Sequence, residues 1–131
     1  MTNGRVYYHV TFTVTRGKPV FLNEETDAEF KRLASEIAHR KGWTILELET
    51  MPNHVHVLIE KAPWQELPRI VNDLKGISAR RLLQRFDWLR GDLGSFHFWS
   101  RGYHYVRHTD ATLATVRAYI RNQRRAGGLT E

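Results

Sequence analysis

Apolar residues in this chain recur at two different periods, and the order of these periods constrains the fold more than any other feature of the sequence. Tyr7 to Thr15 alternates apolar and polar residues strictly, as a half-buried strand does. Residues 24–41 repeat their apolar positions every three or four residues, between a capping Asn23 and Gly42, which predicts an amphipathic helix. A chain of this kind is expected to build a sheet with helices packed on it.

The middle of the sequence continues this alternation. Trp43–Thr50 and His54–Glu60 predict two strands, which form a hairpin around the turn Met51-Pro52-Asn53. Pro68–Phe86 predicts a second helix, because proline suits the first turn and the apolar positions recur at helical spacing. Asp87–Gly94 is charged and predicts a loop.

The last third of the sequence predicts one more strand region and one more helix. Phe96–Trp99 and Tyr103–Val106 indicate either one bent strand or a small hairpin, and Thr112–Arg125 predicts a helix capped by Thr109 or Asp110. The order β-α-β-β-α-β-α predicts an α+β fold. We expect a ferredoxin-like (RRM-like) antiparallel sheet with helices packed on it and an added C-terminal helix, in a single domain over residues 1–131.

The net charge of +6 is distributed unevenly along the chain. Residues 1–65 carry eight basic and eight acidic side chains, whereas residues 66–131 carry twelve basic, eleven of them arginine, and six acidic. Arginine makes planar, bidentate contacts to phosphate. The excess therefore indicates nucleic acid as the partner, and the alternative is an ordinary solvated basic face.

Several classes of protein are excluded by what the sequence lacks. The chain has no cysteine, which excludes disulfides, cysteine-based metal sites and a thiol nucleophile. No apolar run approaches the ~18–20 residues of a membrane span, and residues 1–6 lack the apolar stretch of a signal peptide. A soluble, cytoplasmic protein is the expectation.

Two patterns could carry chemistry. His54 and His56 are two residues apart on a predicted strand, so both imidazoles point to one face and could hold one metal ion, or could be an ordinary surface pair. Leu113, Val116 and Ile120 form the predicted buried stripe of the last helix. Tyr119 then lies at the border of this stripe with Gln123 one turn further on, a position that also suits an amphipathic packing residue.

These patterns carry a resemblance to the single-tyrosine transposases of the HUH superfamily. Residues 51–59 (Met-Pro-Asn-His-Val-His-Val-Leu-Ile) resemble the family's His-hydrophobic-His strand, and residues 119–123 (Tyr-Ile-Arg-Asn-Gln) resemble its nucleophile helix. Residues 74–80 (Leu-Lys-Gly-Ile-Ser-Ala-Arg) and 98–103 (Phe-Trp-Ser-Arg-Gly-Tyr) resemble two further family segments. The segments stand in family order and span nearly the whole chain.

The resemblance implies a mechanism and a cofactor. Tyr119 would attack a phosphate of single-stranded DNA, leaving a 5′-phosphotyrosine link and a free 3′-hydroxyl that can later reverse the reaction. His54, His56 and Gln123 would bind one divalent ion, Mg²⁺ or Mn²⁺, that polarises the phosphate. Two imidazoles and an amide by themselves favour manganese or zinc instead.

The resemblance also implies partners: a DNA hairpin with flanking single strand, and a second copy of the chain. In a homodimer that exchanges the tyrosine helix, Tyr119 and the histidines could belong to different subunits. A location at the nucleoid follows. The basic half would supply the DNA contacts, with candidates Lys75, Arg80, Arg81, Arg85, Arg101, Arg107, Arg121, Arg124 and Arg125. The candidates to stack unpaired bases are Trp64, Trp88, Trp99, Tyr103 and Tyr105, although Trp99 fits an aromatic core strand better.

Other functions remain open at this stage. A ferredoxin-like nucleic-acid-binding module without chemistry would share the basic, aromatic surface, but it gives no reason for the paired histidines with Tyr119 and Gln123. A related nickase of plasmid replication or conjugation is usually longer. Within the transposases, Gln123-Arg124 stands where the REP-associated branch has Asn-Pro, as in mobile insertion sequences. The stretch Arg121–Leu129 otherwise resembles the REP-associated branch, in which Gly-Leu follows, so a domesticated nuclease remains an alternative.

Overall fold

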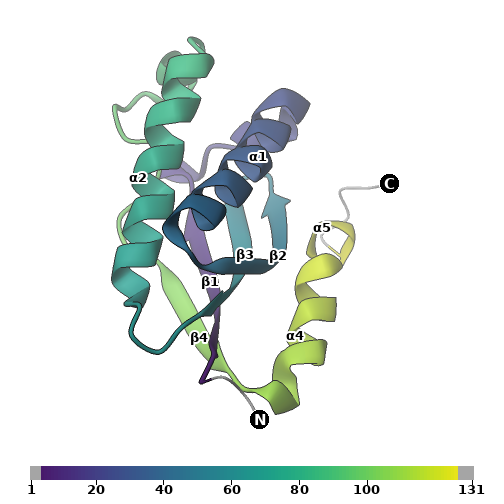
Figure 1. Cartoon of the computed structure of the whole chain (residues 1–131). Coiled ribbons are helices and arrows are strands. Elements are labelled where there is room, and N and C mark those ends of the chain that lie inside the picture. Colours follow the sequence, from purple (N-terminus) through teal and green to yellow (C-terminus); the bar gives the residue numbers. More distant parts are fainter. Residues whose placement is uncertain (1–3, 127–131) are drawn as a thin grey trace.

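An antiparallel sheet of four strands forms the centre of the molecule (Figure 1). The strands are β1 (Val6–Thr13), β2 (Thr44–Met51), β3 (His54–Lys61) and β4 (His104–His108), in the spatial order β2-β3-β1-β4. The computed structural model describes residues 4–126. The predicted α+β fold with a ferredoxin-like antiparallel sheet is confirmed, including the hairpin of β2 and β3.

Helices cover both faces of this sheet (Figure 1). Helices α1 (Glu24–Lys41) and α2 (Leu67–Arg85) pack against one another and share the main hydrophobic core with one face. Helix α4 (Asp110–Arg121) and the short α5 (Gln123–Ala126) lie against the other face, over β2 and β3. Two 3₁₀ turns, η1 (Thr15–Gly17) and η2 (Val20–Leu22), connect β1 to α1. No described helix is long and apolar enough to cross a membrane.

The bounds of α1 are those that its sequence predicts. The Asn23 side-chain Oδ1 accepts a hydrogen bond from the Thr26 backbone N–H at 2.9 Å, which satisfies one of the free amides of the first turn. Gly42 ends the helix in the left-handed conformation with φ of 82°. Both signals are local, so the sequence alone determines where this helix begins and ends.

The central strand β3 is buried on both faces because a layer of helices lies on each side of the sheet. Val55, Val57 and Ile59 point into the main core with α1 and α2. On the opposite face, Leu58 packs with Val116 and Ile120 of α4 in a second, smaller cluster. The strand period places His54 and His56 together on the face opposite the inward valines, as predicted, and the structure adds that α4 covers this face.

Trp99 belongs to the main core, as its aromatic surroundings in the sequence predict. Its ring centroid lies 4.6 Å from that of Phe12 and 4.7 Å from that of Phe98, both in edge-to-face contact. Its indole N–H donates a hydrogen bond of 3.1 Å to Ser78 Oγ on α2. Trp99 is therefore a packing residue and not a surface for bases.

Three predicted elements differ from the structure. The predicted loop 87–94 contains the short helix α3 (Leu89–Leu93), whose two terminal leucines are fully buried, and Gly94 ends it. Phe96–Trp99 and Tyr103–Val106 form neither one bent strand nor a hairpin. The first segment makes only an isolated bridge from Trp99 to Val14, whereas the second contributes to β4, which pairs with β1. The last helix begins at Asp110 behind a capping box and is interrupted at Asn122.

Candidate active site

His54 and His56 lie together at the start of β3. Their ring centroids are 5.0 Å apart, and the rings meet edge to face. His54 is half-buried, whereas His56 is only 7% exposed. The structure thus confirms that both imidazoles share one face. They are more buried than an ordinary surface pair would be.

The Nδ1 atom of His54 has a defined partner. It lies 2.8 Å from the side-chain Oδ1 of Asn53 in the turn before β3. Because an amide oxygen can only accept, His54 Nδ1 carries the proton and donates it. Its Nε2 consequently keeps a lone pair, which is the form of imidazole that binds a metal.

A third histidine, His9 on β1, completes the cluster. Its Nε2 lies 2.9 Å from Nδ1 of His56, with ring centroids 5.1 Å apart. Thr11 is the residue directly opposite His56, so His9 is its diagonal neighbour on the same face. The sequence places His9 on the polar side of the first strand, but only the pairing of β1 with β3 brings it to the site.

Burial keeps this histidine cluster uncharged at neutral pH. It lowers the pKa of His9 to about 4, helped by the nearby charges of His108 and His104. Burial likewise lowers the pKa of His56 to about 4, with smaller effects from His9 and His54, and it lowers the pKa of His54. Neutral imidazoles offer lone pairs, so the cluster suits a cation.

Tyr119 lies on α4 directly over these histidines. Its ring centroid is 6.1 Å from that of His9 and 6.2 Å from that of His56, in both cases edge to face. The side chain remains 53% exposed, as its position at the border of the buried stripe predicts. A cavity of about 410 Å³ opens beside it, lined by His9, His108, Thr112, Thr115, Val116 and Tyr119.

An ionic clamp holds α4 on the sheet. Glu47 of β2 accepts a hydrogen bond of 2.9 Å from Nε of Arg117 and one of 2.6 Å from Nη2 of Arg121. Hydrogen bonding from Arg121, followed by that from Arg117, holds the pKa of Glu47 below its ordinary value. The clamp fixes the helix that carries Tyr119, and it involves one of the arginines predicted to contact DNA.

Gln123 and Arg124 follow the interruption at Asn122, so Tyr119 and Gln123 do not share one continuous helix. Gln123 is half-buried and begins α5, which packs beside β2, the neighbour of the histidine strand. Arg124 Nη1 donates to Oγ1 of Thr50 at 2.6 Å, and its Nη2 donates to the backbone oxygen of Phe21 at 2.9 Å. These bonds attach α5 to the body of the protein directly after the interruption at Asn122.

The residues at the site fit a divalent cation. Nε2 of His56 is buried and has no hydrogen-bond partner among the described residues, an arrangement that costs free energy unless something else satisfies the atom. Within residues 4–126, no three His, Asp or Glu side chains are arranged to hold a metal. A cation on His54 and His56 would therefore need further ligands of another kind, such as the amide of Gln123 or water.

The remaining predicted DNA contacts differ in whether their side chains bind other residues or are exposed. Nζ of Lys75 donates to the backbone oxygens of Ser100 and Gly102 at 2.8 and 2.6 Å, and so connects α2 to the segment before β4. Arg85 pairs with Glu29 at 3.5 Å. Arg80, Arg101 and Arg107 are exposed, and Arg81 is half-buried. Arg125 lies in α5.

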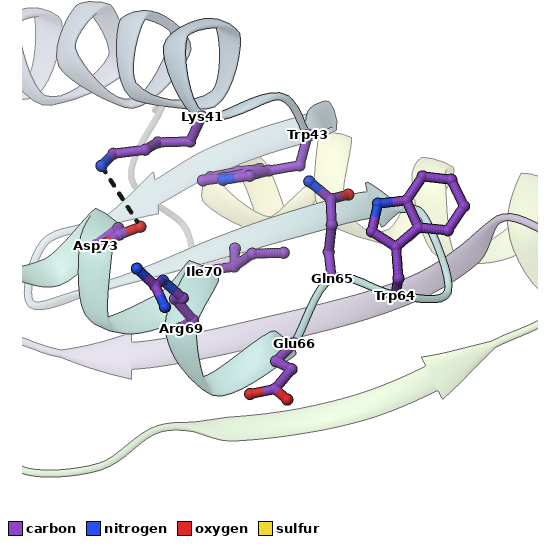
Figure 2. A pocket seen from close by; sticks show the side chains of 8 residues that line it. All are labelled: Lys41, Trp43, Trp64, Gln65, Glu66, Arg69, Ile70 and Asp73. Atoms are coloured by element: carbon purple, nitrogen blue, oxygen red, sulfur yellow. Dashed lines mark ion pairs between the residues drawn. The ribbon is translucent and has the colours of Figure 1, made fainter.

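A second cavity, of about 450 Å³, is lined in part by residues that follow the end of β3, whereas the histidines lie at its start. Figure 2 shows the side chains that line this cavity. Trp64, predicted as a base-stacking residue, is 82% exposed at this cavity. Lys41 and Asp73 form an ion pair of 3.9 Å across it. Of the other predicted stacking residues, Trp88 and Tyr105 are exposed and Tyr103 is half-buried.

Sheet, helix arrangement and sequence together define the protein as a transposase. The chain belongs to the family of IS200-like transposases, whose pattern matches residues 2–123. Among its relatives is the ISDra2 transposase TnpA of Deinococcus radiodurans, which is 32% identical over 128 residues, covering 94% of this chain and 91% of that protein. The transposase of insertion sequence element IS200 from Salmonella typhimurium is 29% identical over 116 residues, covering 88% and 75%.

Solved structures agree with this assignment. A putative transposase from Deinococcus radiodurans R1 superimposes with a TM-score of 0.74 at 30% identity, over 91% of each chain. A REP-associated tyrosine transposase bound to a REP hairpin superimposes with a TM-score of 0.69 over 95% of this chain and 70% of that one. The identity to the second protein is 10%, so this likeness concerns the fold alone.

Proposed function

We propose that this transposase cleaves and rejoins single-stranded DNA at hairpin-bearing ends through a covalent bond between Tyr119 and a 5′-phosphate. The observation that carries the proposal is the contact of Tyr119, an exposed tyrosine, with uncharged histidines, of which His56 is buried and His9 half-buried. A tyrosine that served only to pack α4 would not need this cluster beneath it. The general activity, DNA transposition, follows from membership of the transposase family.

The hydroxyl of Tyr119 is the proposed nucleophile. Its oxygen forms a bond to phosphorus while the bond from phosphorus to the 3′-oxygen breaks, and the departing oxygen gains a proton to become a free 3′-hydroxyl. The phenolic proton of Tyr119 passes to solvent. In the reverse direction, a 3′-hydroxyl attacks the phosphotyrosine and restores Tyr119, so joining needs no outside source of energy.

His54 and His56 are the proposed holders of a divalent cation, with Gln123 as a further ligand. When bound, Mg²⁺ or Mn²⁺ would supply charge stabilisation to the scissile phosphate. The histidines are suited to this role because they are uncharged at neutral pH and their ring planes are fixed by neighbouring side chains. Asn53 occupies Nδ1 of His54, which would leave Nε2 of His54 available to a cation.

The DNA contacts are proposed to come from the exposed part of the basic half. Arg80, Arg101 and Arg107 are available to phosphates, and Trp64 is available to an unpaired base. Arg121 and Arg124 are engaged with Glu47, Thr50 and Phe21, so contact with DNA would require them to share or exchange these partners. Their role in DNA binding remains a prediction.

We further propose that the protein acts as a homodimer. Strand β4 is an edge of the sheet, and Tyr105 and Val106 on it are 55% and 46% exposed. An edge strand with exposed apolar side chains is suited to pairing with a second copy. Sedimentation velocity of the metal-free protein tests this: a single species at the mass of one chain would contradict it.

A covalent adduct is the decisive assay for the chemistry. The protein is incubated with a 3′-labelled single-stranded oligonucleotide that contains a hairpin, in Mg²⁺ or Mn²⁺, and separated by denaturing electrophoresis. We expect an adduct from the wild type, none from Tyr119→Phe, and an unchanged yield from the matched control Tyr8→Phe, which packs against the main core on the other face of the sheet. An adduct that persists in chelator or in Tyr119→Phe would overturn the proposal. DNA binding without any adduct would indicate a binding module without catalysis.

A further inference from the structure

We propose that His9 is a positioning residue, which accepts a hydrogen bond from Nδ1 of His56 and thereby leaves the Nε2 lone pair of His56 free for the cation. His9 is not one of the ligands that the family resemblance implies. The inference rests on the proposed cation site, but it concerns His9 on β1 and not the ligands on β3. One of its two measurements, the tautomer of His56, needs neither metal nor DNA.

The geometry defines the contact. His9 Nε2 and His56 Nδ1 are 2.9 Å apart, and the ring planes are tilted by 30°. The contact is fixed by its surroundings, because His56 is only 7% exposed and lies on a strand inside the sheet, so its ring has little room to rotate. The nitrogen of His9 that faces His56 is engaged by it, so His9 does not offer that atom to a cation.

Only one of the two possible proton arrangements serves a cation. If His9 donated to His56, the proton of His56 would sit on Nε2, a buried atom with no acceptor among the described residues. If His56 donates from Nδ1, Nε2 instead presents a lone pair, which a cation would satisfy. The neighbouring ligand shows the same arrangement, since His54 Nδ1 donates to Asn53 Oδ1.

The environment supports a bond between two neutral rings. His56 is buried and His9 is half-buried, a setting that favours uncharged side chains. One neutral imidazole can donate and the other accept, whereas two imidazolium rings would both be donors and would repel. The pair therefore holds its orientation in the absence of metal.

The first measurement is the tautomer of His56 in the metal-free protein at pH 7.5. Long-range ¹H–¹⁵N correlation spectra of ¹⁵N-labelled protein distinguish a protonated Nδ1 from a protonated Nε2. We expect protonated Nδ1 on His56 in the wild type and a mixture of tautomers in His9→Leu. A His56 that is protonated on Nε2 in the wild type, or a tautomer unchanged in His9→Leu, would overturn the proposal.

The second measurement is the affinity for Mn²⁺ alone, from the loss of the free-ion signal in electron paramagnetic resonance. Removal of an outer-shell partner of a ligating histidine typically weakens metal binding by about 10- to 100-fold, and we expect His9→Leu to fall in this range. His9→Gln retains an acceptor oxygen and should recover part of the loss. His39→Leu, on the exposed surface of α1, is the matched control and should not change the affinity.

The outcomes separate this inference from the proposed function. Mn²⁺ affinity unchanged in a folded His9→Leu would overturn the role of His9 and leave the cation site intact. A wild type that does not bind Mn²⁺ would overturn the cation site, while the tautomer spectra would still decide whether His9 orients His56. If His9→Leu fails to fold, the tautomer and the Mn²⁺ affinity are both measured on His9→Gln. If both variants fold and lose the same affinity for Mn²⁺, the proposal is contradicted.

Discussion

The ring of Tyr119 lies 6.2 Å from the ring of His56 within one and the same chain. The sequence pattern leaves open whether these residues come from one subunit or from two. In the described arrangement, α4 brings its tyrosine to the histidines of its own sheet, and the Glu47 clamp holds it there. A single chain thus contains the contact on which the proposed chemistry depends.

This relationship predicts separate effects on cleavage and on DNA binding. His56→Ala should reduce the yield of covalent adduct by at least about 100-fold, since a lost electrostatic stabiliser of the transition state costs this order of rate. DNA affinity should change less than about threefold, because most affinity comes from phosphate contacts elsewhere. Adduct yield and a gel-shift titration on the same oligonucleotide check both values. Equal losses in the two assays would instead indicate a structural role for His56.

The Glu47 clamp predicts that α4 can be loosened by one substitution. Glu47→Gln removes the charge that both Arg117 and Arg121 contact, while the amide keeps similar size. Hydrogen exchange of the α4 amides should become faster, and exchange in α1 should stay the same. Glu36→Gln is the matched control, because Glu36 pairs with Arg32 on the surface of α1 at 3.2 Å. Unchanged protection of α4 would show that apolar packing alone holds the helix.

The same clamp predicts a pH dependence. The pKa of Glu47 is lowered in the folded protein, chiefly by the hydrogen bond from Arg121. The clamp therefore stabilises α4 fully above the ordinary glutamate value of 4.5, and this contribution is lost as the pH falls through the lowered folded value. Protection factors of α4 in the wild type should decline toward those of Glu47→Gln over this acidic range. Two curves that stay parallel below pH 4.5 would contradict the prediction.

Arg124 is expected to stabilise the fold, whereas Arg101 is expected to bind DNA, so their substitution should have different effects. Arg124→Ala removes hydrogen bonds to Thr50 and Phe21 and should destabilise the protein by about 1–3 kcal/mol in chemical unfolding. Arg101 is exposed, so Arg101→Ala should leave stability unchanged. If Arg101 contacts a phosphate, its loss should reduce the slope of log affinity against log salt by about 1. A stable Arg124→Ala protein would contradict the anchoring role of this residue.

Local signals in the sequence predict much of the fold. The bounds of α1 follow from Asn23 and Gly42, and the inward residues of β3 and α4 follow from periods of two and of about 3.6 residues. The sequence does not reveal α3, since five residues are too few for a periodic pattern. The interruption at Asn122 is equally hidden, and the bonds directly after it join Arg124 to Thr50 and Phe21, residues more than 70 positions away.

The candidate site shows the same division between local and long-range information. Strand period alone places His54 and His56 on one face, and helix period places Tyr119 at the border of α4. His9 could not be found in this way, because its contact with His56 depends on which strands pair and in which register. Glu47 is hidden for the same reason: nothing in its own segment indicates that two arginines 70 and 74 residues later will contact it.

The burial of β3 on both faces has a consequence for how such a protein can change over time. A single inserted or deleted residue within this strand would turn Val55 and Val57 toward α4 and drive the two histidines into the main core. The result would be a protein that fails to fold, and not a folded protein that lacks activity. Length changes within β3 are therefore removed together with the fold, so a change in this strand that leaves an inactive but stable protein has to be a substitution of a histidine.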